Sequence, residues 1–434
     1  MARARTAIGL PGKIVRQIRL LREDPEQFAR NMLQFTDPRR FQERLIDIEV
    51  PPPLRLRIDS ACHTRRTLNV LVPVLAGDST TGGPNTVLHL ALRVARQGVP
   101  VRVVTTRPQA ATDPAWFRGH LARLLGGGAI PDAFEAVSAA NTARPLAIGR
   151  EDVFMATHWT TVQQVKGWLG ELSRKSFIYL IQDFEPGFHP WSSNYALALE
   201  TYDLDFLPVF NEQFLADYFA QHAVGRFADP GFAGASLVFE PAVDRGVFFA
   251  DAQPHAGKRR LLFYARPTNE RNLFGLGLQA LRAAVAHPAF AGWEFQAIGS
   301  RGSLPDFELG NGRVLRNAPW LDYGDYAGLL RGADLLLCPM LSPHTSYPVL
   351  EMAACGGLVV TTSFASKTAA RLGGISPNIM PARPAIGSIA ATLTEAAERV
   401  GRGYDRSAPL ALPGSWDESL GTVAGAIADW ITGA

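Results

Sequence analysis

The 434-residue sequence has little of what would indicate disulfides, a bound metal or a membrane span. Its three cysteines, Cys62, Cys338 and Cys355, lack the spacing of metal ligands. Cys338 and Cys355 stand among apolar residues, where cysteine behaves as a small core residue. No apolar run reaches the roughly 20 residues that cross a bilayer, and no signal peptide is evident. We therefore expect a cytoplasmic protein.

Charge and motif content argue against three further classes of function. A formal net charge of +3 is too small to indicate nucleic acid as a partner. No predicted strand is followed by Gly-x-Gly-x-x-Gly, which makes a dehydrogenase a poor alternative. An Asp-x-Asp pattern occurs at Asp203-Leu-Asp205, but it precedes a predicted strand and a structural role is expected for it. The sequence therefore predicts no metal site.

What the chain does contain is enough apolar residue for more than one core. Hydrophobic residues make up 47% and charged residues 19% of the sequence, which is typical of a globular protein. A chain of 434 residues is too long to form a single ordinary hydrophobic core, so two α/β domains are expected. We place them at 51–250 and 251–412, with a last helix in 413–434 that would cross back to the first domain. Residues 1–50 form a separate basic helical extension.

The start of that extension is rich in arginine and has two interpretations. Ile14, Ile18 and Leu21 recur at helical spacing, and every charged residue before Glu23 is basic. A basic amphipathic helix can lie on an anionic membrane surface, so residues 1–24 could provide a peripheral membrane contact. The alternative, which we favour, is an extension helix packed on the protein with a solvated basic face.

The most informative stretch follows residue 334. Leu335 to Cys338 is predicted to be a buried parallel strand, and Val349 to Ala354 a helix that ends at Gly356-Gly357. Leu358 to Thr361 is predicted to be the next strand. This βαβ order places a helix N-terminus just beyond the carboxyl end of a strand, where open α/β sheets bind ligands and free N–H groups suit a phosphate.

Glu351 would lie about two turns into this helix, facing the same crevice. A carboxylate there can accept hydrogen bonds from two hydroxyl groups, as on a ribose. The alternative is a solvated helix glutamate.

The residues around this glutamate carry a resemblance to a known family. Pro343-His-Thr-Ser-Tyr-Pro-Val-Leu-Glu351 resembles the donor-binding segment of the family-4 GT-B glycosyltransferases, which has two glutamates separated by seven residues. Glu351 matches the second glutamate, whereas Pro343 stands at the first. The form Ser-Tyr-Pro-x-Leu-Glu-Met-Ala is similar to a narrower group, the bacterial rhamnosyltransferases resembling WsaF, which build surface polysaccharide from dTDP-L-rhamnose. The resemblance implies an α/β GT-B fold with two facing Rossmann-like domains. It assigns to donor binding His344, Thr345, Ser346, Tyr347 and Glu351.

A second polar cluster follows the predicted strand Phe177 to Ile181. The segment Gln182-Asp-Phe-Glu-Pro-Gly-Phe-His189 has three ionisable groups at a strand end, which are costly to bury unless water or substrate meets them. It resembles the Gln-Asp-x-Glu-Pro segment of the WsaF-like group, on the acceptor side. The resemblance implies that Asp183 and Glu185 hold an acceptor hydroxyl or stabilise an oxocarbenium-like sugar. The alternative is a carboxylate that caps the following turn or helix.

Two histidines are further acceptor-side candidates. His189 ends the polar segment, and His158 follows the predicted strand Asp152 to Thr157. A histidine satisfied within the core is the common alternative for His158.

Arg266 and Arg271 fall in one predicted strand-to-helix loop, with Asn269 between them. Two cations there can clamp a diphosphate and stabilise the charge that grows as it leaves, so we assign both arginines to catalysis and to donor binding, together with Asn269. Family-4 enzymes carry an Arg and a Lys in this loop, and Arg in place of Lys makes the second role less certain. The alternative is a surface loop of solvated arginines.

Glycines and one tryptophan complete the expected donor site. Gly82 and Gly83 precede a predicted helix and would expose backbone N–H groups to donor phosphate and sugar, although any tight turn can use this pair. By resemblance the nucleobase lies near Gly299 and Trp320, but a buried tryptophan is more often a core residue.

The reaction that the resemblance implies is transfer of a hexose with retention of configuration. L-Rhamnose would pass from dTDP-L-rhamnose to a hydroxyl of a surface glycan or lipid-linked glycan. The leaving diphosphate would itself take the acceptor proton, so no cofactor and no metal are required. A GT-B transferase that uses a UDP- or GDP-sugar remains an alternative. A catalytically silent GT-B scaffold that binds glycan is another.

Overall fold

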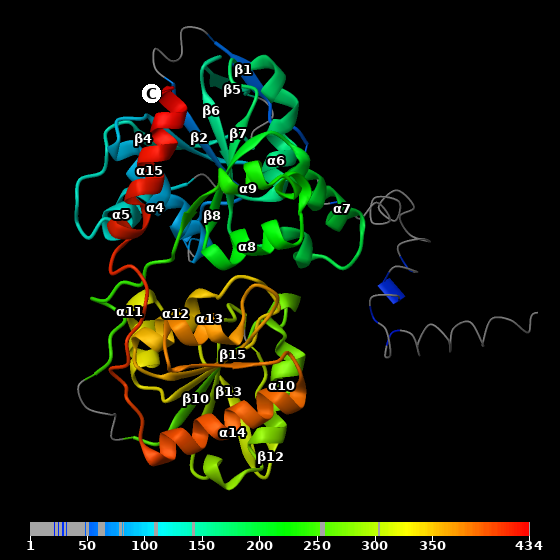
Figure 1. Cartoon of the computed structure of the whole chain (residues 1–434), viewed down its shortest axis with the longest axis vertical. Coiled ribbons are helices and arrows are strands. Elements are labelled where there is room, and N and C mark those ends of the chain that lie inside the picture. The colour runs from blue at the N-terminus through cyan, green and yellow to red at the C-terminus, as the bar shows by residue number, and fades with distance from the viewer. Residues whose placement is uncertain are drawn as a thin grey trace, which may run out of the picture. The chain divides into compact units, whose positions relative to one another are not determined.

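The computed structural model of the chain describes residues 52–59, 66–77, 80, 82–107, 112–140, 144–251, 257–302 and 304–433, and six isolated positions before residue 50. The chain divides into two units, Met1–Glu49 and Val50–Ala434. The predicted basic helix and its membrane contact through residues 1–24 lie, apart from Leu21, outside the described residues. Everything below concerns the second unit, drawn in Figure 1.

The first half of this unit is built on a seven-stranded parallel sheet, because its strands are short apolar runs that can be buried on both faces. The strand order is β4-β3-β2-β6-β7-β8-β9. The bounds are β2 Leu68–Val72, β3 Val101–Thr105, β4 Phe134–Ser138, β6 Val153–Ala156, β7 Phe177–Ile181, β8 Phe206–Asn211 and β9 Leu237–Phe239; β1 (Leu56–Ile58) pairs separately with β5 (Leu146–Ile148).

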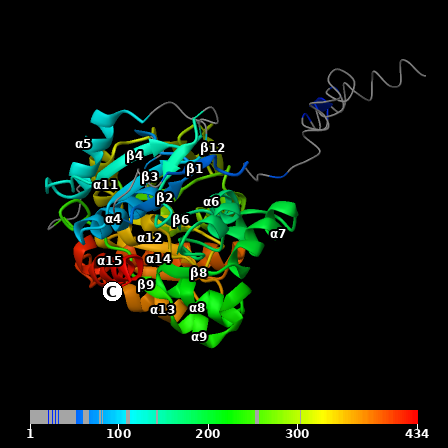
Figure 2. The same cartoon turned by 90° about the horizontal axis from the view of Figure 1, so that it is seen from above.

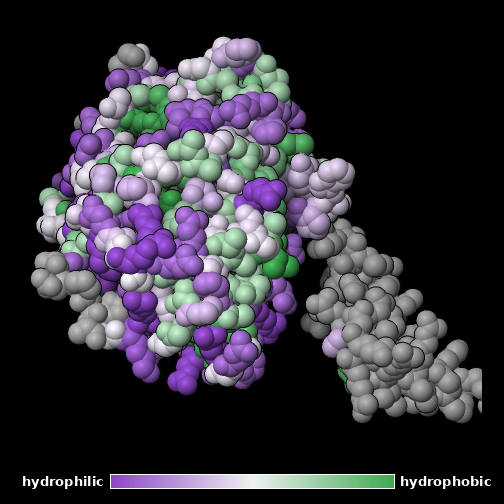
Figure 3. All heavy atoms as spheres, turned by 60° about the horizontal axis from the view of Figure 1, so that its bottom comes forward, coloured by the Kyte–Doolittle hydropathy of each residue, from purple (hydrophilic) through white to green (hydrophobic). Residues whose placement is uncertain are grey.

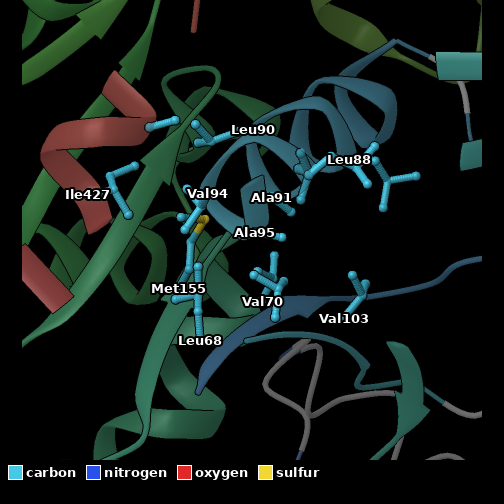
Figure 4. Close-up of a cluster of buried hydrophobic side chains, with 14 of the residues drawn as sticks. Leu68, Val70, Leu88, Leu90, Ala91, Val94, Ala95, Val103, Met155 and Ile427 are labelled. Carbon is cyan, nitrogen blue, oxygen red and sulfur yellow. The ribbon is translucent and has the colours of Figure 1, made fainter. Parts of the chain in front are cut away.

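Helices cover both faces of this sheet. The cluster in Figure 4 joins Leu88, Ala91 and Val94 of α4 to Val70 and Met155 of the strands. The other face packs on α6 and α8. The helices are α4 (Gly83–Arg96), α5 (Pro114–Leu124), α6 (Trp159–Val165), α7 (Ser193–Glu200), α8 (Gln213–Gln221) and α9 (Pro230–Gly234), with 3-10 turns at η2 (Lys166–Glu171), η3 (Glu185–Phe188), η4 (Thr201–Asp203) and η5 (Gly225–Ala228).

The second half repeats the plan. Its sheet has the order β12-β13-β11-β10-β14-β15-β16, and β12 alone of these runs antiparallel to its neighbour. Helices α10 and α14 cover one face, and α11 and α12 the other. The bounds are β10 Arg260–Tyr264, η6 Glu270–Asn272, α10 Phe274–Ala284, η7 Pro288–Phe290, β11 Glu294–Ile298, β12 Phe307–Gly310, β13 Arg313–Asn317, α11 Tyr323–Arg331, β14 Leu335–Cys338, α12 Tyr347–Ala354, β15 Leu358–Thr362, α13 Ala369–Ile375, β16 Ile379–Ala382 and α14 Ile386–Arg402.

The last helix, α15 (Trp416–Thr432), returns to the first half and packs beside α4, as Figures 1 and 2 both show. The ring of Trp416 stacks on His89 with centroids 4.6 Å apart. Asp417 pairs with Arg93 at 2.8 Å. The predicted class, α/β with two Rossmann-like halves, is confirmed by the two sheets and their helices.

One expectation about the central stretch needs correction. Strand β14 has the predicted bounds, but α12 begins at Tyr347 rather than Val349. Pro348 is accommodated because a helix's first turn does not need its N–H group. Glu351 is the fifth residue of this helix, little more than one turn in, whereas about two turns were expected.

The surface and the cysteines add little chemistry. One face of the molecule, shown in Figure 3, intersperses hydrophilic and hydrophobic side chains. Within the described ranges no helix is long and apolar enough to cross a bilayer. The same residues include no group of three or more His, Cys, Asp or Glu placed to hold a metal ion. Cys338 and Cys355 are fully buried in the core around α12.

Candidate active site

The site lies where the carboxyl ends of the two sheets meet. Asp183 follows β7 in the first half, and its carboxylate contacts two groups of the second half. Ser342 donates its hydroxyl to Oδ1 at 2.5 Å, and the Nε of Arg271 lies 3.1 Å from Oδ2. The Arg271 Nε–H is not aligned for a hydrogen bond, so charge holds this pair. The structure thus joins the two predicted catalytic segments directly.

The aromatic ring of Phe188 packs against the Arg271 guanidinium. Its ring lies 4.3 Å from the centre of the Arg271 guanidinium, a cation–π contact. The backbone carbonyl of Arg271 accepts the N–H of Leu341 at 2.8 Å, which ties the arginine loop to the loop before α12. The guanidinium thus contacts the first half, while the Arg271 backbone is anchored within the second.

Glu212, which follows β8, is a second contact between the halves that sequence reasoning missed. Its carboxylate accepts the backbone N–H of Thr345 at 2.8 Å and also the Thr345 hydroxyl. The side chain is buried, and burial raises the pKa of Glu212 to about 8. The sequence carries a signal for this residue. Glu212 is a polar residue directly after the apolar strand β8, as Gln182 and Asp183 are directly after β7.

Tyr347, the first residue of α12, forms a third contact. Its hydroxyl lies 2.6 Å from the Thr86 hydroxyl of α4 and accepts the Asn211 side-chain amide at 3.3 Å. Burial raises the pKa of Tyr347, so the phenol stays neutral and can donate. The predicted donor residue Tyr347 therefore bridges to the loop side of Gly82 and Gly83.

The glycine pair has two distinct environments. Gly82 has a φ of 54° and precedes α4 with open space where a Cβ would stand. Gly83 leaves so little room that a Cβ would meet Gln182 Oε1 at 3.2 Å.

Gln182 Oε1 and His189 Nε2 are buried and have no hydrogen-bond partner among the described residues. Polar groups left without partners at this strand end are what a ligand would satisfy.

Glu351 lies in a second group of residues, around the start of α11 and the end of β10. It accepts the Tyr326 hydroxyl at 3.0 Å, and burial raises its pKa to about 7 against the lowering effect of that bond. Tyr264 lies near the Glu351 carboxylate and is 3.5 Å from the Arg266 guanidinium. A Cβ at Gly299 would lie 2.5 Å from the Tyr264 ring, so only glycine fits there. Arg266, Gly299 and Glu351 are thus gathered around one tyrosine.

Glu185 and His158 are placed differently from Asp183. Glu185 Oε2 accepts the backbone N–H of Trp159 at 2.5 Å and the Tyr179 hydroxyl at 3.1 Å. His158 is the N-cap of α6, with Nδ1 2.8 Å from the Thr160 hydroxyl. Burial raises the pKa of Glu185 to about 8 and lowers that of His158 to about 3. Glu185 thus bonds to the start of α6, an earlier helix of its own half, and not to the following turn that the capping alternative named.

Two predicted donor residues stand at the periphery. Trp320 is 46% exposed, and the Arg301 guanidinium lies 4.8 Å from its ring. Asn269 opens the turn η6 and donates its N–H to the Arg266 carbonyl at 3.0 Å, so it shapes the loop that carries the two arginines.

Lys367, in the loop after β15, is a further residue that sequence reasoning missed. It is fully buried, and its Nζ donates to the carbonyls of His344 at 3.1 Å and Met340 at 3.2 Å. Burial lowers its pKa to about 8. The lysine is thus a fixed cation beneath the loop that leads into α12, and little in the sequence distinguishes it from a surface lysine.

Family models match this chain on both halves of the site. The model described as WsaF, N-terminal domain, matches residues 67–213, and the one described as WsaF, C-terminal domain, matches residues 259–394. The chain belongs to the WsaF family. The predicted membership, which rested on the motifs around Asp183, Arg271 and Glu351, is confirmed.

This WsaF-family chain is also similar to a curated protein and to several solved structures. It is 37% identical over 223 residues to O-antigen biosynthesis protein RfbC of Myxococcus xanthus, covering 48% of this chain and 15% of that one. The chain therefore spans a small part of that relative's length.

The solved structures share the fold at low identity. Sucrose-phosphate synthase from Thermosynechococcus elongatus gives a TM-score of 0.52 at 15% identity, covering 85% of this chain and 95% of that one. WaaG, a glycosyltransferase involved in lipopolysaccharide biosynthesis, gives 0.52 at 14%, covering 85% and 100%. Anabaena HepE in complex with UDP-glucose gives 0.53 at 14%, covering 85% and 99%. With the family match, these likenesses show that the chain has a GT-B fold.

Proposed function

We propose that this protein is a retaining hexosyltransferase that moves L-rhamnose from dTDP-L-rhamnose to a hydroxyl of a bacterial surface glycan. The observation that carries the proposal is the contact of Asp183 with Arg271 and Ser342 across the junction. It brings an acceptor-side carboxylate to the cation that would hold the donor's leaving group. Membership of the WsaF family and similarity to a protein named for O-antigen biosynthesis support the class of product.

In this mechanism the two arginines and the loop before α12 hold the diphosphate. Arg266 and Arg271 supply positive charge, and the Thr345 N–H and hydroxyl supply hydrogen bonds. Their interactions strengthen as negative charge grows on the leaving diphosphate, which lowers the barrier to departure. We propose that these groups suffice without a metal ion, so chelating agents should leave the rate unchanged.

Asp183 then acts on the acceptor face. Its carboxylate, held by Ser342 and Arg271, can orient the acceptor hydroxyl and offset the positive charge on the sugar ring in the transition state. The diphosphate oxygen released on the same face takes the acceptor proton. The bond from the anomeric carbon to the diphosphate breaks on the face where the new bond to the acceptor forms, which retains configuration.

Glu351 is the proposed ribose ligand. Its free carboxylate oxygen can accept hydroxyl hydrogens while Tyr326 fixes the other one. The acceptor would be a glycan or lipid-linked glycan on the cytoplasmic side. A UDP- or GDP-sugar donor is the alternative within the same fold, and the HepE complex with UDP-glucose is a precedent for that donor class.

Calorimetric titration with dTDP, UDP and GDP tests the proposal. We expect dTDP to bind tightest and Glu351→Ala to weaken it at least tenfold. Glu395→Ala, an exposed glutamate of α14, is the matched control and should leave binding unchanged. Preference for UDP or GDP would reject the donor. Absence of binding by all three would favour a silent scaffold.

Turnover of dTDP-L-rhamnose tests the chemistry. Asp183→Asn should lower kcat about 100-fold, because a neutral amide cannot offset the sugar's charge, while the Kd for dTDP changes little. Asp217→Asn, which alters another ion pair between the halves, should leave kcat near the wild-type value. An unchanged kcat for Asp183→Asn would remove this residue from the reaction.

A further inference from the structure

Glu212, a residue of the first half, accepts hydrogen bonds from the groups of Thr345 that the proposed function assigns to donor phosphate. Glu212 is 1% exposed and accepts both the N–H and the hydroxyl of Thr345. Thr345 comes two residues before α12 begins, within the segment matched to donor binding. Hydrogen-bond donors that suit a phosphate oxygen are thus already used by a carboxylate oxygen of the same chain.

The backbone on both sides of this contact is strained. Glu212 has a φ of 96° and is the N-cap of α8, and Ser346 has a φ of 81° and is the N-cap of α12. L residues other than glycine rarely adopt such angles, and those that do concentrate at functional sites. The side chain of the first of these residues, Glu212, bonds to Thr345, and Thr345 directly precedes the second, Ser346.

The titratable and charged groups around Glu212 come from five segments of the chain. His344 Nε2 lies 3.6 Å from Glu212 Oε2, and its Nδ1 accepts the Ser346 N–H at 3.0 Å, so the neutral ring carries its proton on Nε2. Lys367 approaches from the loop after β15. Glu240, after β9, accepts the Gln213 N–H at 3.1 Å, and Arg371 of α13 pairs with Asp217 of α8 at 2.7 Å. Lys367 is therefore the cation that acts on the Glu212 carboxyl group, and the acidic Glu240 acts in the opposite sense.

We propose that Glu212 stands in for the donor diphosphate in the nucleotide-free protein, so that donor binding and withdrawal of Glu212 from Thr345 are one event. This inference rests on the proposed function. It makes Glu212 an internal competitor that lowers donor affinity and keeps the loop before α12 in its binding conformation.

The exchange has a consequence for protons. Burial holds the pKa of Glu212 at about 8, and an exposed glutamate has a pKa of about 4.3. Withdrawal into water near pH 7 therefore releases about one proton, and donor affinity rises with pH between these two values. Lys367 has a lowered pKa of about 8 and His344 one of about 4, so both can add their own smaller proton changes.

The experiment is calorimetric titration of wild type, Glu212→Gln and Glu240→Gln with dTDP and with inorganic diphosphate. Glu240→Gln makes the same change at a neighbouring carboxyl group that does not touch Thr345. Each titration is run near pH 7 in buffers of different ionisation enthalpy, which gives the number of protons released. Subtracting Glu212→Gln from wild type removes contributions of the ligand, Lys367 and His344.

We expect Glu212→Gln to bind both ligands at least tenfold more weakly than wild type near pH 7, because its neutral amide gains nothing by losing a proton on withdrawal, and to release about one proton fewer. Glu240→Gln should match wild type in both respects. Equal affinity and equal proton release for wild type and Glu212→Gln would overturn the inference and leave the proposed function intact. Failure of every nucleotide and of diphosphate to bind wild type would instead reject the proposed function.

If Glu212→Gln does not fold, as its circular dichroism melt would show, the wild-type buffer series decides the matter. Release of close to one proton per dTDP supports the exchange. Release of none contradicts it.

Discussion

At the scale of single residues, two carboxylates that stand two positions apart have different environments. Asp183 follows β7 and contacts Arg271 and Ser342 of the other half. Glu185 opens the turn η3 and bonds instead to the start of α6 and to Tyr179. The same segment thus provides one group to the junction and one to its own scaffold.

Glu185→Ala should therefore act on stability. It would leave the Trp159 N–H buried without its side-chain acceptor and the Tyr179 hydroxyl with only the Thr201 hydroxyl at 3.3 Å, which costs about 2 kcal/mol in the free energy of unfolding. Glu185→Gln keeps an acceptor oxygen and should cost much less, with kcat close to wild type. Urea unfolding and turnover of both variants check this. If the Glu185→Gln variant folded but had no activity, Glu185 would have a catalytic role and this prediction would be wrong.

The sequence predicted which single residues belong to the site, but it did not predict which residues they contact. Asp183, Arg271 and Glu351 were predicted from local motifs, because strand ends and helix starts carry recognisable polar residues. Their contacts could not be predicted, since Ser342 is 159 positions from Asp183 in the chain. Lys367 was missed for the same reason, because its burial depends on a loop that the sequence alone does not place.

At the scale of elements, the two sheets were predictable and the start of α12 was not. Short apolar runs such as Leu335–Cys338 fixed the strands, since a buried parallel strand must be apolar on both faces. The helix start depends on Ser346, whose left-handed backbone is imposed by its surroundings rather than by its own preference. Local propensity therefore misplaced this one boundary by two residues.

Ser346→Gly should raise stability, because glycine adopts a φ of 81° without strain. We expect a gain of about 1 kcal/mol in the free energy of unfolding. The matched control is Ser415→Gly at the N-cap of α15, where the backbone is extended and the serine side chain accepts the Glu418 N–H. That change should lower stability by a few tenths of a kcal/mol. Opposite signs in thermal melts support the argument, and a loss at Ser346 would contradict it.

The packing of α15 on the first sheet makes a separate prediction. Ile427 is fully buried with residues of α4, near Leu90 and Val94 in Figure 4. Ile427→Ala should lower the free energy of unfolding by about 3 kcal/mol through lost burial and a residual cavity. Ile386→Ala, at an exposed position on α14, should change it by less than about 0.5 kcal/mol. Similar losses for both would mean that α15 adds little to this core.

At the scale of the whole molecule, buried acids govern how stability depends on pH. Burial raises the pKa of Glu185 and Glu212 to about 8 and that of Glu351 to about 7. Between about pH 4.5 and 8 the native protein therefore binds more protons than the unfolded chain, so these groups make stability fall as pH rises.

Buried imidazoles act in the opposite sense at lower pH. Burial lowers the pKa values of His89 and His158 to about 3 and those of His120 and His344 to about 4. Between about pH 4.5 and 6.5 these four imidazoles, which outnumber the three acids, are protonated in the unfolded chain and neutral in the native protein, so stability rises with pH there. We expect the Tm to be highest between about pH 6 and 7 and to fall towards pH 8. A series of thermal melts checks this, and a Tm that rises from pH 6.5 to 8 would contradict it. Glu185→Gln should flatten the fall.

Two stretches of chain connect the halves, and this has a mechanical consequence. One follows β9 and the other joins α14 to α15, and Arg245 of the first donates to the Leu410 carbonyl of the second at 3.3 Å. Figure 1 shows both on the same side of the unit. Because the two connections tie the halves together, each half stays at a high effective concentration for the other. Contacts between the halves, such as that of Asp183 with Arg271, can therefore break and re-form without the two halves separating.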